Sequence, residues 1–426
     1  MYLADFLYFL ESWYFIIILG FCVVASVFIA FLLRPSRIGI TPANITLTWT
    51  DDPRTTQTVT WRTKLTPTPG LIQYSEGSRK SSLFLQDVTA MTAVVQRLTT
   101  NVGDISIHSV TLPKLKPGTR YIYRVGDGEI WSKKHQFTTA ADNAQSFKFL
   151  IFGDTQNSYY LTWRKTLHTA YQTNQDAAFF IHVGDLTNKS QNYKEWNMWF
   201  HASRSIIDTI PILPVVGNHE TYTLKKKIYS MPTFFTAQFK VPTNGPIGLT
   251  GQVYSFDYGN IHFSILDTQD REEQKFEPHM LEKQKMWLAN DLQVTDKFWK
   301  IVLMHRSPYD NRSRDGNRIL REAIVPILDK YKVDIVFSGH DHIYARTYPL
   351  RSGSIVKNNI DGTIYITAGR TGKKTYTRTQ RKDYNEVFYN LADESNYITV
   401  AVNGSTITVG VFKQTGLLLD EWIISK

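Results

Sequence analysis

Cysteine is almost absent from this sequence, and that scarcity limits its chemistry. The 426 residues contain one cysteine, Cys22, which lies in a hydrophobic segment near the N-terminus. The remainder of the chain therefore has no disulfide and no thiolate metal site, and cysteine usage says little about the redox compartment. The sequence also has no internal repeat and no low-complexity segment.

The chain is basic overall but lacks a concentrated basic patch. Its net charge of +10 and pI of about 9.3 fit a nucleic acid, an acidic membrane surface or a phosphorylated small substrate as partner. The basic residues are spread out, and the one tight run is Lys225-Lys226-Lys227. A solvated face explains this run better than a nucleic-acid patch does. Nucleic acid is therefore the least favoured of the three partners.

Charge is also missing from a long hydrophobic run near the N-terminus. From Tyr14 to Leu33 about twenty residues carry no formal charge, which is the length that a helix needs to cross a bilayer. A cleaved signal peptide, the alternative, has a basic start and a shorter apolar core, whereas the first thirteen residues here contain neither Lys nor Arg. The sequence therefore predicts an N-terminal transmembrane helix in residues 1–37, which anchors the chain in the lipid bilayer through residues 14–33.

The full chain has the composition of a folded protein, with 42% apolar and 20% charged residues, and is long enough for two or three domains. Residues 38–140 alternate in polarity with a period of two, and turns such as Pro117-Gly118 punctuate them. This pattern predicts an all-β sandwich. Tyr121 and Tyr123 resemble the tyrosine-bearing strand of a fibronectin type III-like (fibronectin III-like) sandwich.

From residue 145 to the C-terminus, predicted strands alternate with predicted helices. The first strands are expected at 147–152, 178–183 and 212–216, with helices at 161–173 and 195–207 between them. Further helices are expected at 281–292 and 320–331, and a run of strands closes the chain. Alternating elements followed by a run of strands predict a layered α/β domain over residues 145–426.

Five apolar strands of this second domain end in polar turns whose side chains can bind metal ions. In four of the turns a glycine precedes the first such side chain, so the backbone can turn sharply. Open α/β sheets place their sites at these strand ends. Mixed oxygen and nitrogen donors suit Mn, Fe or Zn. The candidate ligands in the five turns are Asp154, Asp185, Asn218, His305, His340 and His342.

The last of these turns carries two histidines, His340 and His342, at positions i and i+2. In an extended loop this spacing directs both imidazoles to the same side, where two neutral imidazoles can bind a metal ion. A surface turn is the alternative for a single His-x-His pair. Five such turns in order, each after an apolar strand, favour a two-metal site over coincidence.

The five turns together resemble those of the calcineurin-like metallophosphoesterases and, within that family, those of the purple acid phosphatases. The segment from Gly339 to Thr347 is the most specific match. The likeness extends from about Ile38 to the C-terminus and includes the N-terminal sandwich that these phosphatases carry. It implies a metallophosphoesterase domain that is a layered αββα sandwich, with two packed β-sheets flanked by helices and a dinuclear metal centre at the strand ends.

The resemblance also assigns roles to the candidate ligands. Asp185 would bridge two metal ions, which would clamp a phosphoryl group and lower the pKa of a bound water, so that a metal-bound hydroxide attacks phosphorus in line. The first ion would be bound by Asp154 and His342, and the second by Asn218, His305 and His340.

Two further side chains receive roles at the substrate. The resemblance places His219 where it would act as a catalytic residue, protonating the leaving oxygen or holding the phosphate. The alternative for His219 is a hydrogen-bonding partner behind the ligands. Arg306 could help to hold the phosphate, and the alternative there is an exposed arginine at the rim of the site.

The sequence departs from the family pattern at two positions. Purple acid phosphatases have a tyrosine three residues after the bridging aspartate, and here that residue is Asn188. Broader family members have a histidine two residues after the first aspartate, where this chain has Gln156. Both remain candidate ligands, Gln156 through its carbonyl oxygen. Without the phenolate, a divalent pair of Fe, Mn or Zn ions is favoured over an Fe(III) site.

These observations predict a membrane-anchored, metal-dependent phosphoesterase that hydrolyses phosphate monoesters, or diesters, of phosphorylated small molecules. A surface-binding protein on a phosphoesterase scaffold and a nuclease with a basic, aromatic-lined groove are the alternatives. Loops 221–251 and 370–393 would set the choice of substrate. The positive-inside count, which depends on Arg34 and Arg37, places the catalytic domain in the cytoplasm. The family resemblance makes export common, and we expect the catalytic domain outside the cytoplasm.

Overall fold

The structure is a computed structural model that describes residues 18–23, 39–66, 68–77, 88–157, 159–313, 317–390 and 392–426. It contains two compact units, Met1–Gly39 and Ile40–Lys426. In the first unit residues 18–23 are helical, and the apolar side chains of Ile18, Phe21 and Val23 are exposed. The rest of the predicted span 14–33 lies outside the described residues. Within the ranges given above, no helix is long and apolar enough to cross a membrane.

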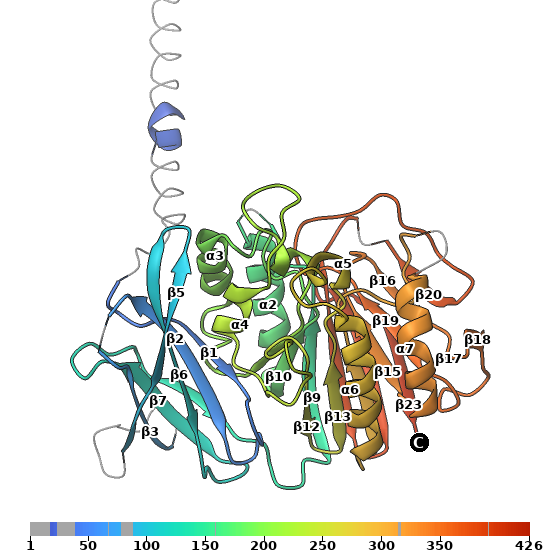
Figure 1. The fold of residues 1–426 in the computed structure, drawn as a ribbon, viewed down its shortest axis with the longest axis horizontal. Helices are drawn as coiled ribbons and strands as arrows, with labels where there is room; N and C mark the ends of the chain where they lie inside the picture. The colour runs from blue at the N-terminus through green and yellow to red at the C-terminus, as the bar shows by residue number, and fades with distance from the viewer. Residues whose placement is uncertain are drawn as a thin grey trace, which may run out of the picture. The chain divides into compact units, whose positions relative to one another are not determined.

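The second unit begins with a sandwich of two four-stranded antiparallel sheets, as the alternation of polarity predicts (Figure 1). One sheet has the order β1-β2-β6-β5, with β1 at Ala43–Thr48, β2 at Gln57–Lys64, β6 at Gly103–Leu112 and β5 at Val94–Thr100. The other has the order β4-β3-β7-β8, with β4 at Thr89–Thr92, β3 at Leu71–Glu76, β7 at Arg120–Gly126 and β8 at His135–Thr138.

Aromatic side chains fix the sandwich and join it to the next domain. Tyr121 lies in the sandwich core, and its hydroxyl accepts a hydrogen bond of 2.8 Å from the backbone N–H of Lys116, five residues upstream. Such a bond back to the preceding corner is typical of the tyrosine-bearing strand predicted here. Trp49, just after β1, packs instead in the core of the α/β domain, with its ring centroid 5.4 Å from that of Phe179. Trp49 therefore ties the sandwich to the core of the α/β domain.

The α/β domain contains two large sheets. The six-stranded sheet has the order β11-β10-β9-β21-β22-β23, with bounds Ile212–Pro214, Ala177–His182, Ser146–Phe152, Asn396–Asn403, Thr406–Lys413 and Leu418–Ser425. The seven-stranded sheet has the order β12-β13-β14-β15-β19-β16-β20, with bounds Tyr254–Tyr258, Ile261–Ile265, Trp299–Leu303, Ile335–Ser338, Ile364–Ala368, Tyr344–Thr347 and Asn385–Tyr389. A two-stranded hairpin joins β17 at Leu350–Arg351 to β18 at Ser354–Ile355.

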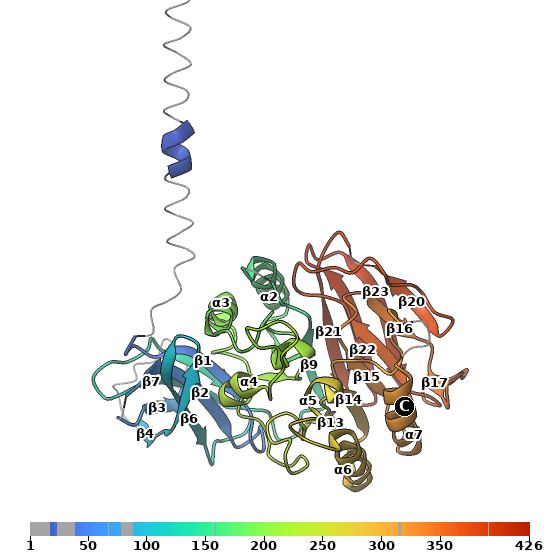
Figure 2. The ribbon, with the colours of Figure 1, turned by 45° about the horizontal axis from the view of Figure 1, so that its top comes forward.

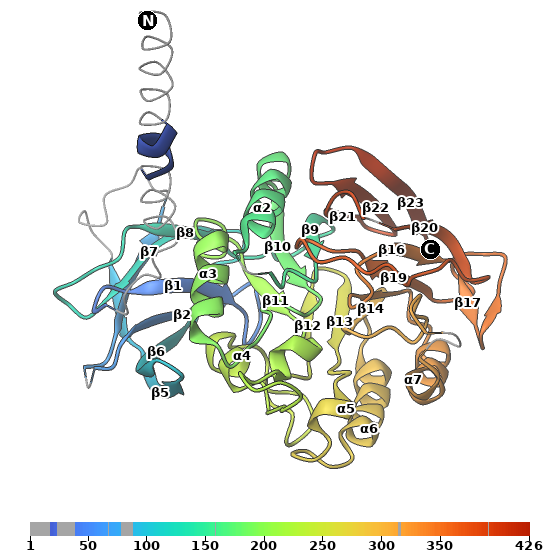
Figure 3. The ribbon, with the colours of Figure 1, turned by 90° about the horizontal axis from the view of Figure 1, so that it is seen from above.

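Helices cover the outer faces of these two sheets, which gives the predicted layered arrangement (Figures 2 and 3). Helices α2 and α6 lie on opposite sides of the pair of sheets in Figure 3. Buried apolar residues of both sheets form the core between the layers, and a second cluster fills the space under α6 and α7. The helices are α2 at Leu161–Thr173, α3 at Tyr193–Ser203, α4 at Thr233–Gln238, α5 at Asp270–Glu273, α6 at Met280–Val294 and α7 at Arg318–Lys330.

Most predicted elements appear within a few residues of their expected bounds, and the helix at 161–173 coincides with α2. The helix expected at 195–207 is shorter, because α3 ends at Ser203. Ser205 adopts a left-handed conformation with φ of 70°, which an α-helix cannot contain. Apolar periodicity continued past this point because Ile206 and Ile207 are buried in the turn that follows the helix.

Candidate metal centre

The topology brings the five predicted turns to one place. Strands β9, β10 and β11 run parallel in one sheet, and β14 and β15 run parallel in the other. Their carboxyl ends therefore lie at a common edge. Backbone hydrogen bonds link the turns there: the N–H of Asp154 donates to Gly184 O at 3.1 Å, and that of Gly339 donates to His305 O at 2.9 Å.

The carboxylates and imidazoles from these turns form two groups that share Asp185. One group is Asp154, Asp185 and His342, which we call the first half-site; the other is Asp185, His305 and His340, the second half-site. Within each group the ligand atoms lie within 4.8 Å of one another. The Asp154 and Asp185 side chains are fully buried. The structure thus brings the five predicted His and Asp ligands together as two adjoining clusters.

The predicted amide ligand lies in the second half-site. Asn218 Oδ1 is 3.3 Å from His305 Nε2, while its Nδ2 donates to the hydroxyl of Tyr222 at 3.0 Å. The same His305 Nε2 lies 3.3 Å from Asp185 Oδ1 and 3.3 Å from His340 Nδ1. Four electron-pair donors therefore face one small volume, and a cation there would satisfy all of them.

Backbone carbonyls fix the rings of two histidines. Nδ1 of His305 lies 2.8 Å from Val183 O, and Nδ1 of His342 lies 2.7 Å from Lys374 O. A carbonyl can only accept, so each Nδ1 carries a proton, and each Nε2 is the ring atom left to face a ligand. Such bonds behind a ligating histidine fix its orientation and raise its basicity.

The electrostatics of the second half-site depend on Asp185. Burial, the largest influence on His305, lowers its pKa, but the Asp185 and Asp154 carboxylates outweigh burial and raise the pKa to about 9. Burial acts to raise the pKa of Asp185, yet His305 and His219 hold that pKa well below its usual range. Burial and the charge of His305 together hold the pKa of His340 well below its usual value. Asp185 is therefore ionised and His340 neutral, the forms that bind metals.

Four of the candidate ligand residues adopt a left-handed backbone conformation that residues other than glycine rarely adopt. The residues and their φ angles are Asp154 at 54°, Asp185 at 58°, His340 at 73° and His342 at 57°. Each costs roughly 1–3 kcal/mol and persists where the surrounding structure imposes it, typically at functional sites. The loop is therefore not extended at His340 and His342, although their spacing was interpreted in terms of an extended loop. The two imidazoles nevertheless reach the same centre, one in each half-site.

The glycines of the turns are needed mainly because neighbouring ligand atoms approach their backbone closely, and less because of unusual dihedral angles. Of the four, only Gly184 has a positive φ, 96°. A Cβ at Gly339 would lie 2.5 Å from Asp154 Oδ2, and one at Gly184 would lie 2.5 Å from His305 Nδ1. Any side chain at these positions would displace a ligand, so the reason for the glycines differs from the predicted sharp turn.

His219, the predicted catalytic residue, lies beside the centre. Its Nδ1 is 2.7 Å from Asn188 O, so Nδ1 carries the proton and Nε2 points toward the ligands. Nε2 lies 3.8 Å from Asp185 Oδ2 and 3.2 Å from the ammonium of Lys374. Burial lowers the pKa of His219. The ring thus lies beside the Asp185 carboxylate that the two half-sites share.

The three remaining candidates differ in position. Gln156 enters the first half-site, where its Nε2 lies 2.9 Å from Asp185 Oδ2 and 3.0 Å from His342 Nε2. The side chain of Asn188 is exposed, and only its backbone carbonyl reaches the site, through His219. Arg306 forms a two-pronged ion pair with Glu272, with both N–O distances 2.8 Å. Its charge is therefore already paired.

Sequence reasoning missed the carboxylate that organises the turns. Glu220 is fully buried and accepts backbone N–H bonds from Gly217 at 2.9 Å and from Asp185 at 2.8 Å. It also accepts from the N–H groups of Leu186 and Thr187 at 3.0 and 3.2 Å. Its place directly after His219 in a ligand-bearing turn was the available signal.

Three residues at the rim were also missed. Tyr376 packs against His342 with ring centroids 4.4 Å apart, and the guanidinium of Arg312 lies 3.9 Å from the Tyr376 ring centre. Lys374 contacts the same ring at 5.2 Å. Tyr376 and Lys374 belong to the loop 370–393 that was expected to set substrate choice, but no local pattern singles them out.

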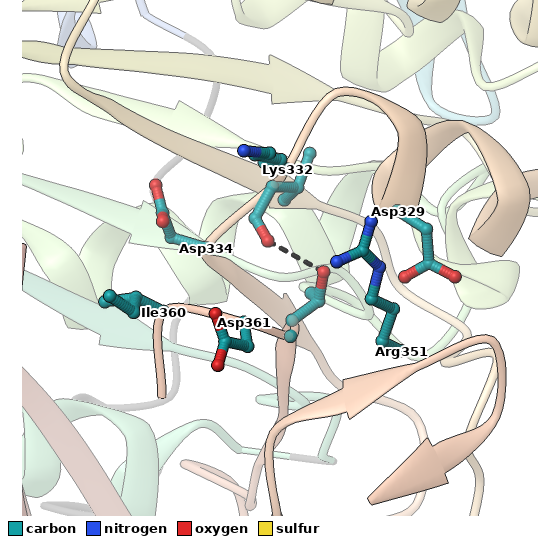
Figure 4. A pocket seen from close by; sticks show the side chains of 9 residues that line it. Asp329, Lys332, Asp334, Arg351, Ile360 and Asp361 are labelled. Carbon is teal, nitrogen blue, oxygen red and sulfur yellow. Dashed lines mark hydrogen bonds between the residues drawn. The ribbon is translucent and has the colours of Figure 1, made fainter. Parts of the chain in front are cut away.

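A small pocket at the other end of β15 is distinct from this centre (Figure 4). Asp334, just before β15, lines it together with Lys332, Arg351 and Asp361, whereas the ligand-bearing turn follows the strand. Its volume of about 50 Å³ can hold a water molecule or two but no phosphate ester. It is therefore no rival to the metal centre as a substrate site.

The donor set fits metal ions. Two buried carboxylates, three imidazoles and an amide oxygen converge, and in the described part of the chain no Lys or Arg forms an ion pair with Asp154 or Asp185. Buried carboxylates need a compensating cation. Mixed oxygen and nitrogen donors of this kind suit Mn, Fe or Zn.

Comparison with known protein families agrees with this geometry. Residues 42–139 match the purple acid phosphatase N-terminal domain, and residues 147–344 match the calcineurin-like phosphoesterases. The chain therefore contains a calcineurin-like phosphoesterase domain preceded by a purple acid phosphatase N-terminal domain. The predicted family is thereby confirmed, and with it the class of metal-dependent hydrolases.

The proteins to which this chain is similar include one named as an acid phosphatase and one named as inactive. It is 27% identical over 360 residues to mouse acid phosphatase type 7, covering 78% of each chain. It is 27% identical over 304 residues to the Arabidopsis thaliana protein named probable inactive purple acid phosphatase 24, covering 62% of this chain and 48% of that one. The structure of a yellow lupin purple acid phosphatase superposes with a TM-score of 0.75 at 19% identity, covering 90% of this chain and 74% of that chain. This last likeness supports the fold alone.

Proposed function

We propose that this protein is a membrane-anchored, dinuclear-metal phosphoesterase that hydrolyses phosphate monoesters and, as a second class, diesters. The observation that carries the proposal is that the two half-sites share Asp185. Its Oδ1 lies 3.3 Å from His305 Nε2, whereas its Oδ2 accepts from Gln156 at 2.9 Å. The two oxygens of one carboxylate thus face different half-sites, as bridging requires.

The residues point to a divalent pair of Mn, Zn or Fe ions. Asp154 and His342 would hold the first ion, with Gln156 beside them, and Asn218, His305 and His340 would hold the second. Asn188 stands where a purple acid phosphatase has its tyrosine, and its side chain is exposed. No phenolate comes from that position, so Fe(III) is not favoured.

The chain's own groups would position the substrate. When bound, two divalent ions clamp a phosphoryl group and lower the pKa of a water molecule. Hydrolysis breaks the bond from phosphorus to the leaving oxygen, which then needs a proton. His219 would hold the phosphate or supply that proton, and because Asn188 O fixes Nδ1, its Nε2 is the atom that serves.

We further propose an anchor in residues 1–37, a sandwich domain in 38–140 and a catalytic domain in 145–426, with the catalytic domain outside the cytoplasm. The uncharged run 14–33 and the exposed apolar side chains within 18–23 support the anchor. Cell fractionation tests it: the chain should need detergent for release from membranes. External protease should cleave the catalytic domain in intact cells, and protection of that domain would contradict the orientation.

The catalytic proposal is tested by metal analysis and hydrolysis assays on the full chain in detergent. We expect about two metal ions per chain, with turnover of p-nitrophenyl phosphate as monoester and of bis(p-nitrophenyl) phosphate as diester. Asp185→Asn should lower kcat/KM on the order of 10³-fold, because one oxygen no longer carries the bridging charge. Asp291→Asn, a buried aspartate outside the centre, is the matched control and should keep both ions.

Two outcomes would change the proposal. A chain that binds no metal and hydrolyses neither ester after reconstitution with Mn, Zn or Fe would be a binding protein on a phosphoesterase scaffold. A strong visible absorption band would mean that Fe(III) is bound and that the divalent pair is wrong.

A further inference from the structure

Two cationic side chains, Lys374 and Arg312, lie at the rim of the metal centre, and we call them the rim cations. Lys374 Nζ is 3.2 Å from His219 Nε2, and Arg312 Nη1 is 3.3 Å from His340 Nε2. Neither forms an ion pair with an Asp or Glu among the residues that the structure describes. Arg306, by contrast, is paired with Glu272.

The position of Lys374 is fixed by the ligand-bearing turns. The N–H groups of Thr371 and Gly372 donate to Gly153 O at 2.7 Å and to Asp154 O at 3.0 Å. The carbonyl of Lys374 itself accepts from His342 Nδ1 at 2.7 Å. The loop that carries Lys374 is therefore attached to two of the three turns that supply the first half-site, those of Asp154 and His342.

Tyr376 connects the two rim cations. Its ring contacts the Arg312 guanidinium at 3.9 Å and the Lys374 ammonium at 5.2 Å, and it packs on His342 at 4.4 Å. Cation–π contacts of this kind hold a positive charge over a ring without neutralising it. The ring is already occupied by these three neighbours, so its role is to hold the cations rather than to stack on a nucleobase.

Arg312 lies one imidazole ring away from the reacting centre, whereas Lys374 lies directly beside it. His340 turns its Nδ1 toward His305 in the second half-site, and its Nε2, on the other side of the ring, faces Arg312. Lys374 stands beside Nε2 of His219, the same nitrogen that faces the Asp185 carboxylate. The separation of Arg312 from the centre suits a second charged group on the substrate, and Tyr376, which contacts both cations, keeps Lys374 beside it.

We propose that the rim cations bind a second anionic group of the substrate, so that the preferred substrates are phosphate esters that carry a further phosphate or carboxylate. This inference rests on the proposed phosphoesterase function. Charge-assisted hydrogen bonds from an ammonium and a guanidinium to such a group are among the stronger polar contacts in proteins.

Matched substrate pairs test this preference on the full chain. Fructose 1,6-bisphosphate against fructose 6-phosphate tests a second phosphate, and 2-phosphoglycerate against glycerol 2-phosphate tests a carboxylate. We expect kcat/KM to be about tenfold higher for the more anionic member of at least one pair. The pair that shows the larger ratio identifies the anionic group.

Variants assign the preference to residues. Arg312→Met and Lys374→Met should each lower the ratio within the preferred pair severalfold, and the double variant should bring it close to one. Because Lys374 also contacts His219, the ratio is the readout rather than the rate alone. Lys373→Met removes an exposed neighbouring charge that makes none of these contacts and should leave the ratio unchanged. Equal rates within both pairs for the unaltered chain, or an unchanged ratio in the double variant, would overturn the inference.

Failure of catalysis itself would give a different result. If the metal-loaded chain hydrolyses none of these esters, the proposed function fails, and calorimetry with pyrophosphate and orthophosphate then decides the role of the rim. Tighter binding of pyrophosphate that disappears in the double variant would support the rim as an anion site. Equal affinities for the two anions would contradict it.

Discussion

Two clusters of histidine and aspartate in this molecule, each around a buried histidine, have similar protonation behaviour and different architecture. In the metal centre, His305 lies beside Asp185, and its pKa is raised to about 9. On β13, His262 lies between Asp257 and Asp291, and its pKa is also raised to about 9, with burial opposing the two carboxylates. Protonation alone therefore does not distinguish a ligand centre from an internal ion cluster.

The His262 cluster is internally satisfied. Nδ1 of His262 meets Asp257 at 2.8 Å, and Nε2 meets Asp291 at 2.9 Å. The hydroxyls of Ser255 and Ser264 donate to the two oxygens of Asp291 at 2.6 and 2.7 Å. Each donor has an acceptor, and the charged imidazole is paired on both sides, so nothing further needs to bind.

The metal centre instead has an excess of acceptors. His305 Nε2 and His340 Nδ1 face one another at 3.3 Å, and Asn218 Oδ1 faces the same point. Four of its residues are held in left-handed conformations, whereas none of the four residues around His262 has a positive φ. Converging lone pairs and imposed backbone strain are thus the better markers of a ligand site.

The largest expected effect comes from replacing one histidine in each cluster, because only the replacement in the metal centre should impair metal binding and activity. His305→Gln should lower kcat/KM for p-nitrophenyl phosphate on the order of 10³-fold and remove about one metal ion, because Nε2 is the donor that faces three other ligand atoms. His262→Gln should keep both ions and most of the activity. Metal analysis and steady-state kinetics on both variants check this. Loss of metal in His262→Gln would mean that the comparison is wrong.

The next largest effect is expected from substitution of Glu220, which supports the turns of the metal centre although its side chain does not face the metal sites. Glu220→Gln replaces a carboxylate that accepts four backbone N–H bonds with an amide whose nitrogen cannot accept any. We expect metal affinity to fall about 10–100-fold, as for other partners behind metal ligands. Competition with a chromogenic chelator measures the change. Asp291→Asn is the control, and equal losses in both variants would indicate general destabilisation.

How far the sequence predicts this architecture depends on how far apart in the sequence the interacting residues lie. Strand and helix positions follow from local periodicity, and α2 occupies its predicted residues. The convergence of the ligand turns follows from parallel strands ending at one edge. The left-handed backbone of His340 does not follow, since its N–H bonds to Asp154, 186 residues away, help to impose it. Lys374 was missed for the same reason, because contacts with His342 and His219, both distant in sequence, bring it to the site.

The pH dependence of stability is a smaller effect and should come from His262. Its pKa is about 9 in the folded chain against about 6.5 when unfolded. The stabilisation is therefore fully present below pH 6.5 and is lost as the pH rises through 9. Asp257 is 49% exposed, so solvent screening reduces the contribution to about 2 kcal/mol. Urea unfolding at pH 6 and pH 9.5 measures it, and His262→Asn should flatten this difference.

The smallest expected effect concerns Gln156, the residue that departs from the family pattern. Its Nε2 contacts Asp185 Oδ2 and His342 Nε2, while its Oε1 is buried and has no hydrogen-bond partner in the described part of the chain. None of the side chains around His262 has such an unpartnered buried atom. An amide rotation would turn Oε1 toward the first half-site, where a neutral carbonyl is a weaker ligand than an imidazole.

Substitutions at Gln156 therefore test whether the first half-site binds its metal ion weakly because it has a glutamine in place of a histidine. Gln156→Leu should lower the affinity for the first ion by less than about tenfold, because Asp154, Asp185 and His342 remain, and Gln156→His should raise it by a comparable factor. Retention of each ion during timed chelator treatment measures both changes. If Gln156→Leu loses its first ion as readily as Asp154→Asn, then Gln156 is a full ligand. If neither substitution alters retention, then Oε1 faces only water, and the first half-site consists of the two carboxylates and His342.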